Sequence, residues 1–100
     1  MIKHLVLVKF KPGITADDPR VQEVMARFER MPEQIETIRG WQVGLNFAER
    51  PFGSDWALCS DFENEAAFQA YLQHSVHIEA VKLWQKIATW TYCDFVYLMV

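Results

Sequence analysis

Alternation between apolar and polar positions, interrupted by proline and glycine, divides the chain into predicted strands and helices. Residues 2–10, 41–48 and 56–62 alternate with period two and are rich in β-branched and aromatic side chains, which predicts three strands. A fourth strand, rich in threonine and aromatic residues, is predicted over residues 89–97, and an apolar tail follows at residues 98–100. The pattern therefore favours a protein with a four-stranded sheet.

The first predicted strand is apolar on both of its faces. One face holds Ile2, His4, Val6, Val8 and Phe10, and the other holds Lys3, Leu5, Leu7 and Lys9. Because the centre of each face is apolar, we expect helices to cover one face and something else to cover the second. In the second predicted strand, Gly44 suggests a bulge or a close approach of another element.

Helical spacing separates the predicted strands. Asp18 and Pro19 have the pattern of an N-cap followed by proline at the first helical position. Apolar residues then recur at helical spacing as far as Pro32, which we expect to end or kink the helix. Residues 33–38 are expected to add a short turn. Asn64 is the predicted N-cap of the second helical region.

The order of these elements predicts a ferredoxin-like α+β fold, βαββαβ, over residues 1–100 as a single domain, with an antiparallel sheet and helices on one face. The second face of the sheet stays apolar. Since 51% of the residues are apolar and 14% are aromatic, the chain has more apolar side chains than a small monomer needs. We therefore expect a second copy of the sheet to cover this face, which gives a homodimeric α/β barrel.

Charge and cysteine content exclude several classes of partner. The net charge is −3 and the basic residues are scattered, so nucleic acid is not an expected partner. We expect no signal peptide, because the N-terminal residues alternate from Lys3 and His4 onward and lack an apolar core with a small-residue cleavage site. We also expect no membrane-spanning segment, because no apolar run approaches about 18 residues. Cys59 and Cys93 lack CxxC spacing, and we interpret them as buried thiols that act as small hydrophobes. These features favour a reducing cytoplasm.

The residues best suited to chemistry fall in the segment 71–77, which holds a tyrosine and two of the three histidines. Tyr71 and His77 are six residues apart, about 240° around a continuous helix, so they would point to different sides. They can share a pocket only if the helix breaks between them. Ser75 could cap a new helix, and we therefore predict a break near residues 73–76.

Across such a break, a phenol and an imidazole could face one apolar cavity. Imidazole titrates near neutral pH and can move protons, while tyrosine can donate a hydrogen bond to an enolate oxygen. Together Tyr71 and His77 could promote enolisation or intramolecular condensation of a carbonyl compound without a cofactor. The alternative is purely structural: a tyrosine at a helix end and a histidine bonded to backbone carbonyls.

Other candidate sites are weaker. His4, His74 and His77 could form a facial metal site, but no carboxylate has HExxH-type spacing, and we expect neither a metal nor a cofactor. Trp84 shares an apolar helical stripe with His77, which makes it a core or interface residue first and a ligand-binding candidate second. Asp94 is expected to make a structural hydrogen bond or ion pair rather than to act in catalysis.

Several segments resemble a known family. Residues 2–11, 40–46 and 55–62 resemble the first three strands of the stress-responsive dimeric α/β-barrel (Dabb) domain. Residues 70–77 resemble that family's tyrosine followed by an HPxH motif, with Ser75 where the motif has proline. The resemblance covers nearly the whole chain and implies a ferredoxin-like protomer that forms a homodimeric barrel.

The resemblance also implies a site. One plant member is a polyketide cyclase that closes an aromatic ring by aldol condensation, and its tyrosine and histidine match Tyr71 and His77. Its first-strand histidine matches His4, and Val6 and Val8 would line the same cavity. The implied ligand is a small apolar or aromatic molecule. His77 would be the general base, Tyr71 the hydrogen-bond donor, and His4 a positioning residue. The resemblance makes His74 a structural residue that caps or braces the break.

Two other functions stay open. The chain could be a non-catalytic dimer whose stability or interactions are its function, as the stress association of plant members implies, and its cavity would then be filled by side chains. Other dimeric ferredoxin-like barrels perform oxygenase-type or haem-related reactions, although no feature of the sequence favours this. An open cavity reached by both Tyr71 and His77 would favour a ligand-binding role.

Overall fold

The computed structural model describes residues 1–98, which form four strands and three helices. In chain order these are β1 (Ile2–Phe10), α1 (Pro19–Gln34), β2 (Gly40–Leu45), β3 (Trp56–Phe62), α2 (Glu65–Gln73), α3 (Ser75–Ile87) and β4 (Ala88–Val96). All four predicted strands are present, although β2 ends at Leu45 rather than at residue 48. Of the predicted tail at residues 98–100, the last two residues lie outside the described part of the chain.

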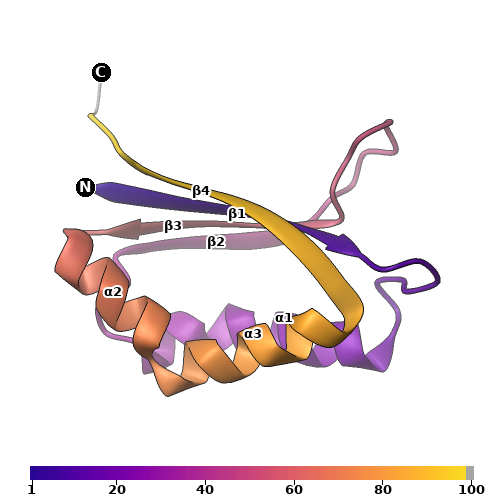
Figure 1. Cartoon of the computed structure of the whole chain (residues 1–100), viewed down its shortest axis with the longest axis horizontal. Coiled ribbons are helices and arrows are strands. Elements are labelled where there is room, and N and C mark those ends of the chain that lie inside the picture. The colour runs from indigo at the N-terminus through magenta and orange to yellow at the C-terminus, as the bar shows by residue number, and fades with distance from the viewer. Residues whose placement is uncertain (99–100) are drawn as a thin grey trace.

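The strands form one antiparallel sheet in the order β2-β3-β1-β4, with the three helices on one of its faces (Figure 1). β1 lies at the centre of this sheet and pairs with β3 on one side and with β4 on the other. This is the ferredoxin-like α+β fold, so the fold class predicted from the sequence is confirmed. The second helical region is divided into α2 and α3, which meet at one residue.

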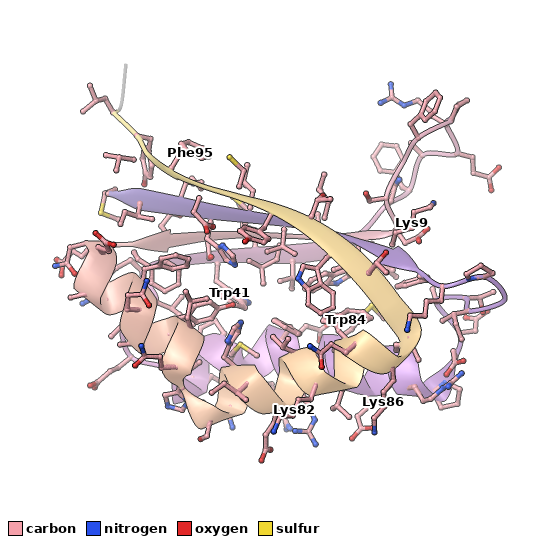
Figure 2. All side chains as sticks on the ribbon, in the orientation of Figure 1. Lys9, Trp41, Lys82, Trp84, Lys86 and Phe95 are labelled. Atoms are coloured by element: carbon pink, nitrogen blue, oxygen red, sulfur yellow. The ribbon has the colours of Figure 1, made fainter. Side chains whose placement is uncertain are left out.

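The core lies between the sheet and the helices, as alternation along β1 requires. His4 and Val8 are buried on the helix side, whereas Leu7 on the opposite side is 49% exposed. The buried apolar residues of this core are Val8, Val21, Val24, Met25, Phe28, Met31, Ile35, Trp56, Leu58, Phe62, Phe68, Tyr71, Ala80, Trp84, Ile87 and Ala88. Figure 2 shows Trp84 between the sheet and the helices, while Lys82 points away from the sheet.

Helix α1 begins where the sequence predicts it to begin. Asp18 is the N-cap, and its carboxylate accepts a hydrogen bond of 2.9 Å from the backbone N–H of Arg20. The prediction that Pro32 ends the helix is wrong, because the helix continues to Gln34. Proline has no N–H for the carbonyl four residues earlier, which is that of Phe28. The indole N–H of Trp41 donates to this carbonyl at 2.9 Å and replaces the missing helical bond.

The face of the sheet away from the helices, here called the open face, is apolar at its centre. Leu5 pairs with Cys59 on one side and with Cys93 on the other, and Phe95 also stands on this face (Figure 2). The interpretation of both cysteines as buried is therefore wrong within one chain: Cys93 is exposed and Cys59 is half-buried, and both are free thiols. Within residues 1–98 no helix covers the side of the sheet to which they point.

Gly44 does not have the role predicted for it. The β2–β3 register runs without a bulge from the pair Gly40 and Asp61 to the pair Leu45 and Trp56. A Cβ atom at Gly44 would meet no atom within 4 Å, because this residue lies on the open face. The close approach occurs instead at Gly40, where a Cβ atom would lie 2.2 Å from Oδ2 of Asp61.

Candidate functional site

Helices α2 and α3 are separated by a break of one residue, His74, whose backbone is extended with φ −67° and ψ 136°. Its N–H donates to the carbonyl of Tyr71 at 3.1 Å, and its ring Nδ1 accepts from the N–H of Val76 at 3.2 Å. The predicted break is confirmed, and His74, not Ser75, is the capping residue. Ser75 occupies the first position of α3, where proline is equally accepted, so the serine does not remove the break.

The break brings Tyr71 and His77 to the same side. Their ring centroids are 4.3 Å apart and the ring planes are inclined by 44°. On an unbroken helix the two side chains would lie about 240° apart around the axis, which is an angular separation of about 120°. Tyr71 is held by further ring contacts, with Phe62 at 5.0 Å and with Trp41 at 5.9 Å, and it is only 1% exposed. Its position is therefore fixed from several sides.

The hydrogen bond of His77 determines which ring nitrogen is available. Nδ1 lies 3.1 Å from the carbonyl oxygen of Leu72, and a carbonyl can only accept, so Nδ1 carries the proton. Nε2 of the neutral ring then keeps its lone pair. Burial lowers the pKa of His77, although the bond to Leu72 opposes this and the neighbouring His4 and His74 add to it. His77 is thus held as a neutral base near neutral pH.

The phenol of Tyr71 has the opposite tendency. Burial raises its pKa well above the ordinary value of 10, and the nearby carboxylate of Asp94 raises it further. Tyr71 therefore stays protonated and can donate a hydrogen bond, and it makes no side-chain hydrogen bond within residues 1–98. A neutral base and a neutral donor side by side are the two groups that enolisation requires.

His4 reaches the same region from β1. Its ring centroid is 5.9 Å from that of Tyr71, and its Nδ1 is hydrogen-bonded to Oδ1 of Asp94 on the neighbouring strand β4. The carboxylate therefore orients the imidazole of His4. His4 is 6% exposed, whereas the side chain of Asp94 is 29% exposed, so the pair is buried at the histidine and open to solvent at the carboxylate.

These groups line a cavity of about 290 Å³ between the sheet and the helices. Its lining residues are His4, Val6, Val8, Phe28, Trp56, Leu58, Tyr71, Leu72, His77, Val81, Trp84, Trp90, Tyr92 and Asp94. Of these, Tyr92 on β4 is 68% exposed, and His77 and Val81 on α3 are half-buried. The cavity therefore opens between α3 and β4.

The cavity has a polar end and an apolar remainder. His4, Tyr71, His77 and Asp94 supply the polar groups, whereas Val6, Val8 and Trp84 lie in the apolar part. That these residues bind a ligand stays a prediction. Trp84 packs against Trp56 at 5.5 Å and against Phe28 at 6.4 Å between ring centroids. Its indole N–H has no acceptor among the described residues, so ring packing alone holds it.

Metal binding does not follow from this arrangement. The described residues hold no group of three or more histidine, cysteine, aspartate or glutamate side chains placed to bind an ion. The facial set of three histidines considered from the sequence does not form, because His74 caps α3 while His4 is bonded to Asp94.

Sequence reasoning missed part of the site. Asp94 does make the structural bond expected of it, but its partner is His4 and its carboxylate lines the cavity. The signal was the antiparallel register, which pairs His4 with Asp94 once β1 and β4 are neighbours. Phe28 also lines the cavity. Whether it does so depends on how α1 is rotated about its axis, and nothing in the sequence of α1 points specifically to a ligand.

Comparison with known proteins identifies the family. A family model described as the stress responsive A/B barrel domain (Dabb) matches residues 2–97 of the chain. The chain belongs to the Dabb family. An uncharacterised protein of Streptomyces coelicolor is 38% identical to this Dabb chain over 95 residues, which are 95% of this chain and 98% of the relative. A stress-response A/B barrel domain-containing protein of Arabidopsis thaliana is 31% identical over 80 residues, 77% of this chain and 68% of the relative.

Solved structures agree with the fold. A dimeric protein of unknown function and ferredoxin-like fold from Bacteroides fragilis has a TM-score of 0.76 and 28% identity, covering 96% of this chain and 95% of its own. A hydroxynitrile lyase from Passiflora edulis has a TM-score of 0.83 at 14% identity, covering 99% of this chain and 94% of its own. The second likeness shows a shared fold alone.

Within residues 1–98 no helix is long and apolar enough to cross a membrane.

Proposed function

We propose that this Dabb chain, as a single domain over residues 1–100, forms a homodimer through its open face and binds a small aromatic or apolar carbonyl compound in the cavity. The observation that carries the ligand proposal is the placement of Tyr71 and His77, with rings 4.3 Å apart, on the wall of an open cavity. The volume of about 290 Å³ lies at the lower end of the roughly 300–1,000 Å³ of small-molecule sites, which favours a ligand with one aromatic ring.

The proposed chemistry is proton transfer next to a carbonyl group. Nε2 of His77 removes a proton from the carbon beside the carbonyl, and the hydroxyl of Tyr71 donates a hydrogen bond to the enolate oxygen. The enolate carbon then either takes a proton back or attacks a second carbonyl of the same molecule. In the latter case a carbon–carbon bond forms, and the imidazolium returns its proton to the new alkoxide. His4, oriented by Asp94, positions the ligand, and no cofactor takes part.

The homodimer proposal is supported by the open face and by a relative. Leu5, Leu7 and Phe95 leave an apolar surface that the helices do not cover, and such surfaces mark interaction sites. The similar protein from Bacteroides fragilis is described as dimeric. The free thiols Cys59 and Cys93 fit a reducing compartment such as the cytoplasm.

Deuterium exchange tests the chemistry without knowledge of the natural substrate. Aryl alkyl ketones that raise the melting temperature of the protein would be incubated with it in D₂O, and loss of the proton beside the carbonyl followed by NMR. We expect the wild-type chain to accelerate exchange. His77→Gln and Tyr71→Phe should each lower the exchange rate by about 100-fold or more, since each removes a group that acts in the transition state.

Lys82→Gln, on the outer surface of α3, is the matched control and should exchange the ketone as the wild type does. Unchanged exchange in both site variants would refute the roles given to Tyr71 and His77. Ketone binding without any exchange would support a non-catalytic binding protein instead. For the dimer, a monomer in sedimentation analysis at micromolar concentration would contradict the proposal.

A further inference from the structure

The connection between β2 and β3 projects from the body of the molecule. Residues 46–55, here called the arm, leave the sheet on the side away from the helices, which is the side of the open face (Figure 1). The last described residues after β4 rise on the same side at the other end of the sheet (Figure 1). The open face is therefore flanked at both ends by raised segments.

The arm is attached to the sheet by a set of hydrogen bonds at its base. The N–H of Asn46 donates to the carbonyl of Asp55 at 2.8 Å, and the side-chain amide of Asn46 donates to the carbonyl of Ser54 at 2.6 Å. Asp55 is in turn bonded to β1, with its N–H donating to Val8 at 2.8 Å and its carboxylate accepting from the N–H of Phe10 at 2.7 Å. These bonds hold the arm in a defined direction.

The tip of the arm is a tight turn with an unfavourable residue in it. The N–H of Gly53 donates to the carbonyl of Arg50 at 3.3 Å, which closes a four-residue turn with Pro51 at its second position. Phe52 at the third position has φ 67° and is the one non-glycine residue with positive φ within residues 1–98. Glycine or asparagine normally occupies this position, because a bulky side chain is disfavoured there.

The same residue is also fully exposed. Phe52 has a relative exposure of 105% and Phe47, near the base, has 98%. Phenylalanine at position 52 therefore has two costs in the single chain. Its backbone adopts a conformation that glycine would adopt more easily, and its apolar ring is exposed to water. Backbone strain of this kind persists where surrounding contacts compensate for it, and the described residues of the single chain leave the Phe52 ring fully exposed.

We propose that Phe52 and Phe47 of the arm are anchors that insert into the second copy of the chain across the open face. This inference rests on the proposed homodimer and adds the segment that holds it together. In the dimer each arm extends beyond the ends of its own strands β2 and β3 and buries its two rings against the partner. Burial of the ring then offsets both the strain at Phe52 and the exposure.

The area of the sheet supports a second copy as the occupant. Four strands spaced about 4.8 Å apart and paired over about seven residues present a projected area of about 450 Å². A standard interface buries roughly 800 Å² on each partner. Contacts beyond the flat part of the sheet would bring the buried surface closer to this value, and two aromatic rings at about 150 Å² each would add about 300 Å².

The charge of the arm argues against a membrane surface as the occupant. Glu49 and Arg50 lie side by side near the tip, and Asp55 at the base is also acidic, so the arm has no excess of basic residues. Association with anionic lipid requires such an excess in addition to apolar side chains.

Three variants test the inference by sedimentation equilibrium over a dilution series. Phe52→Gly removes the ring and suits the positive φ, so the turn keeps its backbone and the far-UV circular dichroism should not change. Phe47→Ser removes the second ring. Each should raise the dimer dissociation constant by at least about 30-fold, as expected for an anchor residue of an interface. Ile78→Ser, which removes an exposed apolar side chain from α3 on the helix side, is the matched control and should leave the constant unchanged.

The outcomes separate the inference from the proposal on which it rests. A wild-type chain that is monomeric at micromolar concentration overturns the homodimer, and the arm contact with it. A wild-type dimer whose dissociation constant is unaffected by Phe52→Gly and Phe47→Ser overturns the arm contact alone. Co-sedimentation with phosphatidylserine vesicles that is lost in Phe52→Gly, with an unchanged dimer, would assign the arm to membranes instead and likewise overturn the inference.

Discussion

Replacing Trp41 by phenylalanine tests how the chain accommodates a proline inside α1. Pro32 leaves the carbonyl of Phe28 without its helical partner, and the indole N–H of Trp41 supplies the missing donor at 2.9 Å. Phenylalanine keeps an aromatic ring at this position but has no N–H. Because Trp41 also contacts Tyr71, with ring centroids 5.9 Å apart, the same bond helps to hold a residue of the candidate site.

The magnitude follows from the two backgrounds in which the substitution is made. With Pro32 present, Trp41→Phe leaves a partly buried carbonyl unsatisfied, which costs about 1–3 kcal/mol, in addition to the smaller ring. With Pro32→Ala, the backbone N–H of residue 32 becomes available to Phe28, and the indole bond is no longer needed. We therefore expect Trp41→Phe to cost about 1–2 kcal/mol less in the alanine background.

Urea denaturation of the four proteins, at one fixed protein concentration and followed by far-UV circular dichroism, measures this coupling. Trp90→Phe is the matched control, because the Trp90 indole makes no hydrogen bond to the described residues and should cost the same in both backgrounds. If Trp41→Phe costs the same with and without Pro32, within about 0.5 kcal/mol, the proposed exchange of donors is wrong.

The other predictions concern single residues of the site and the sheet. Burial lowers the pKa of His77 in the folded chain. As the pH falls, the His77 side chain of the unfolded chain is therefore protonated before that of the folded chain. The stability that His77 contributes is present above about pH 6.5 and declines as the pH falls below this value. The urea midpoint of the wild type should therefore fall more between about pH 7.5 and about pH 5.5 than that of His77→Gln, and parallel pH profiles would contradict this. His74→Ala removes the ring that accepts from Val76 and should lower the free energy of unfolding by about 1 kcal/mol, whereas His74→Asn, which can cap, should lower it less. Gly40→Ala places a Cβ atom 2.2 Å from the Asp61 carboxylate and should destabilise the chain by about 1–3 kcal/mol in thermal denaturation. Gly44→Ala in the same strand, with no atom within 4 Å, should cost clearly less in that assay, and equal losses would show that crowding is not the cause.

Local pattern was sufficient for the elements and for one feature of the site. The alternation of residues 2–10 predicts both the strand and its two apolar faces, and β1 has those bounds. Helix arithmetic on Tyr71 and His77 predicts a break near 73–76, which lies at His74. These successes depend on spacing within one segment, which the sequence contains in full.

Features that depend on a neighbouring element were not predictable in this way. Pro32 does not end α1 because an indole from β2 replaces its missing donor. The role of Asp94 depends on β4 lying beside β1 in a register that pairs it with His4. Whether Cys93 is buried depends on which face the helices cover. The catalytic roles of Tyr71 and His77 stay a prediction, which the deuterium-exchange experiment tests.

The one-residue joint between α2 and α3 has a consequence for how such a chain can evolve. Each residue added to or removed from the joint would rotate α3 by about 100° about its axis relative to α2. An insertion beside His74 would carry His77 away from Tyr71 and turn a different side chain toward the cavity, even though every residue of the motif were still present. The joint should accordingly accept many substitutions but no change of length. The number of residues between the tyrosine and the histidine matters because it sets the rotation of α3 relative to α2.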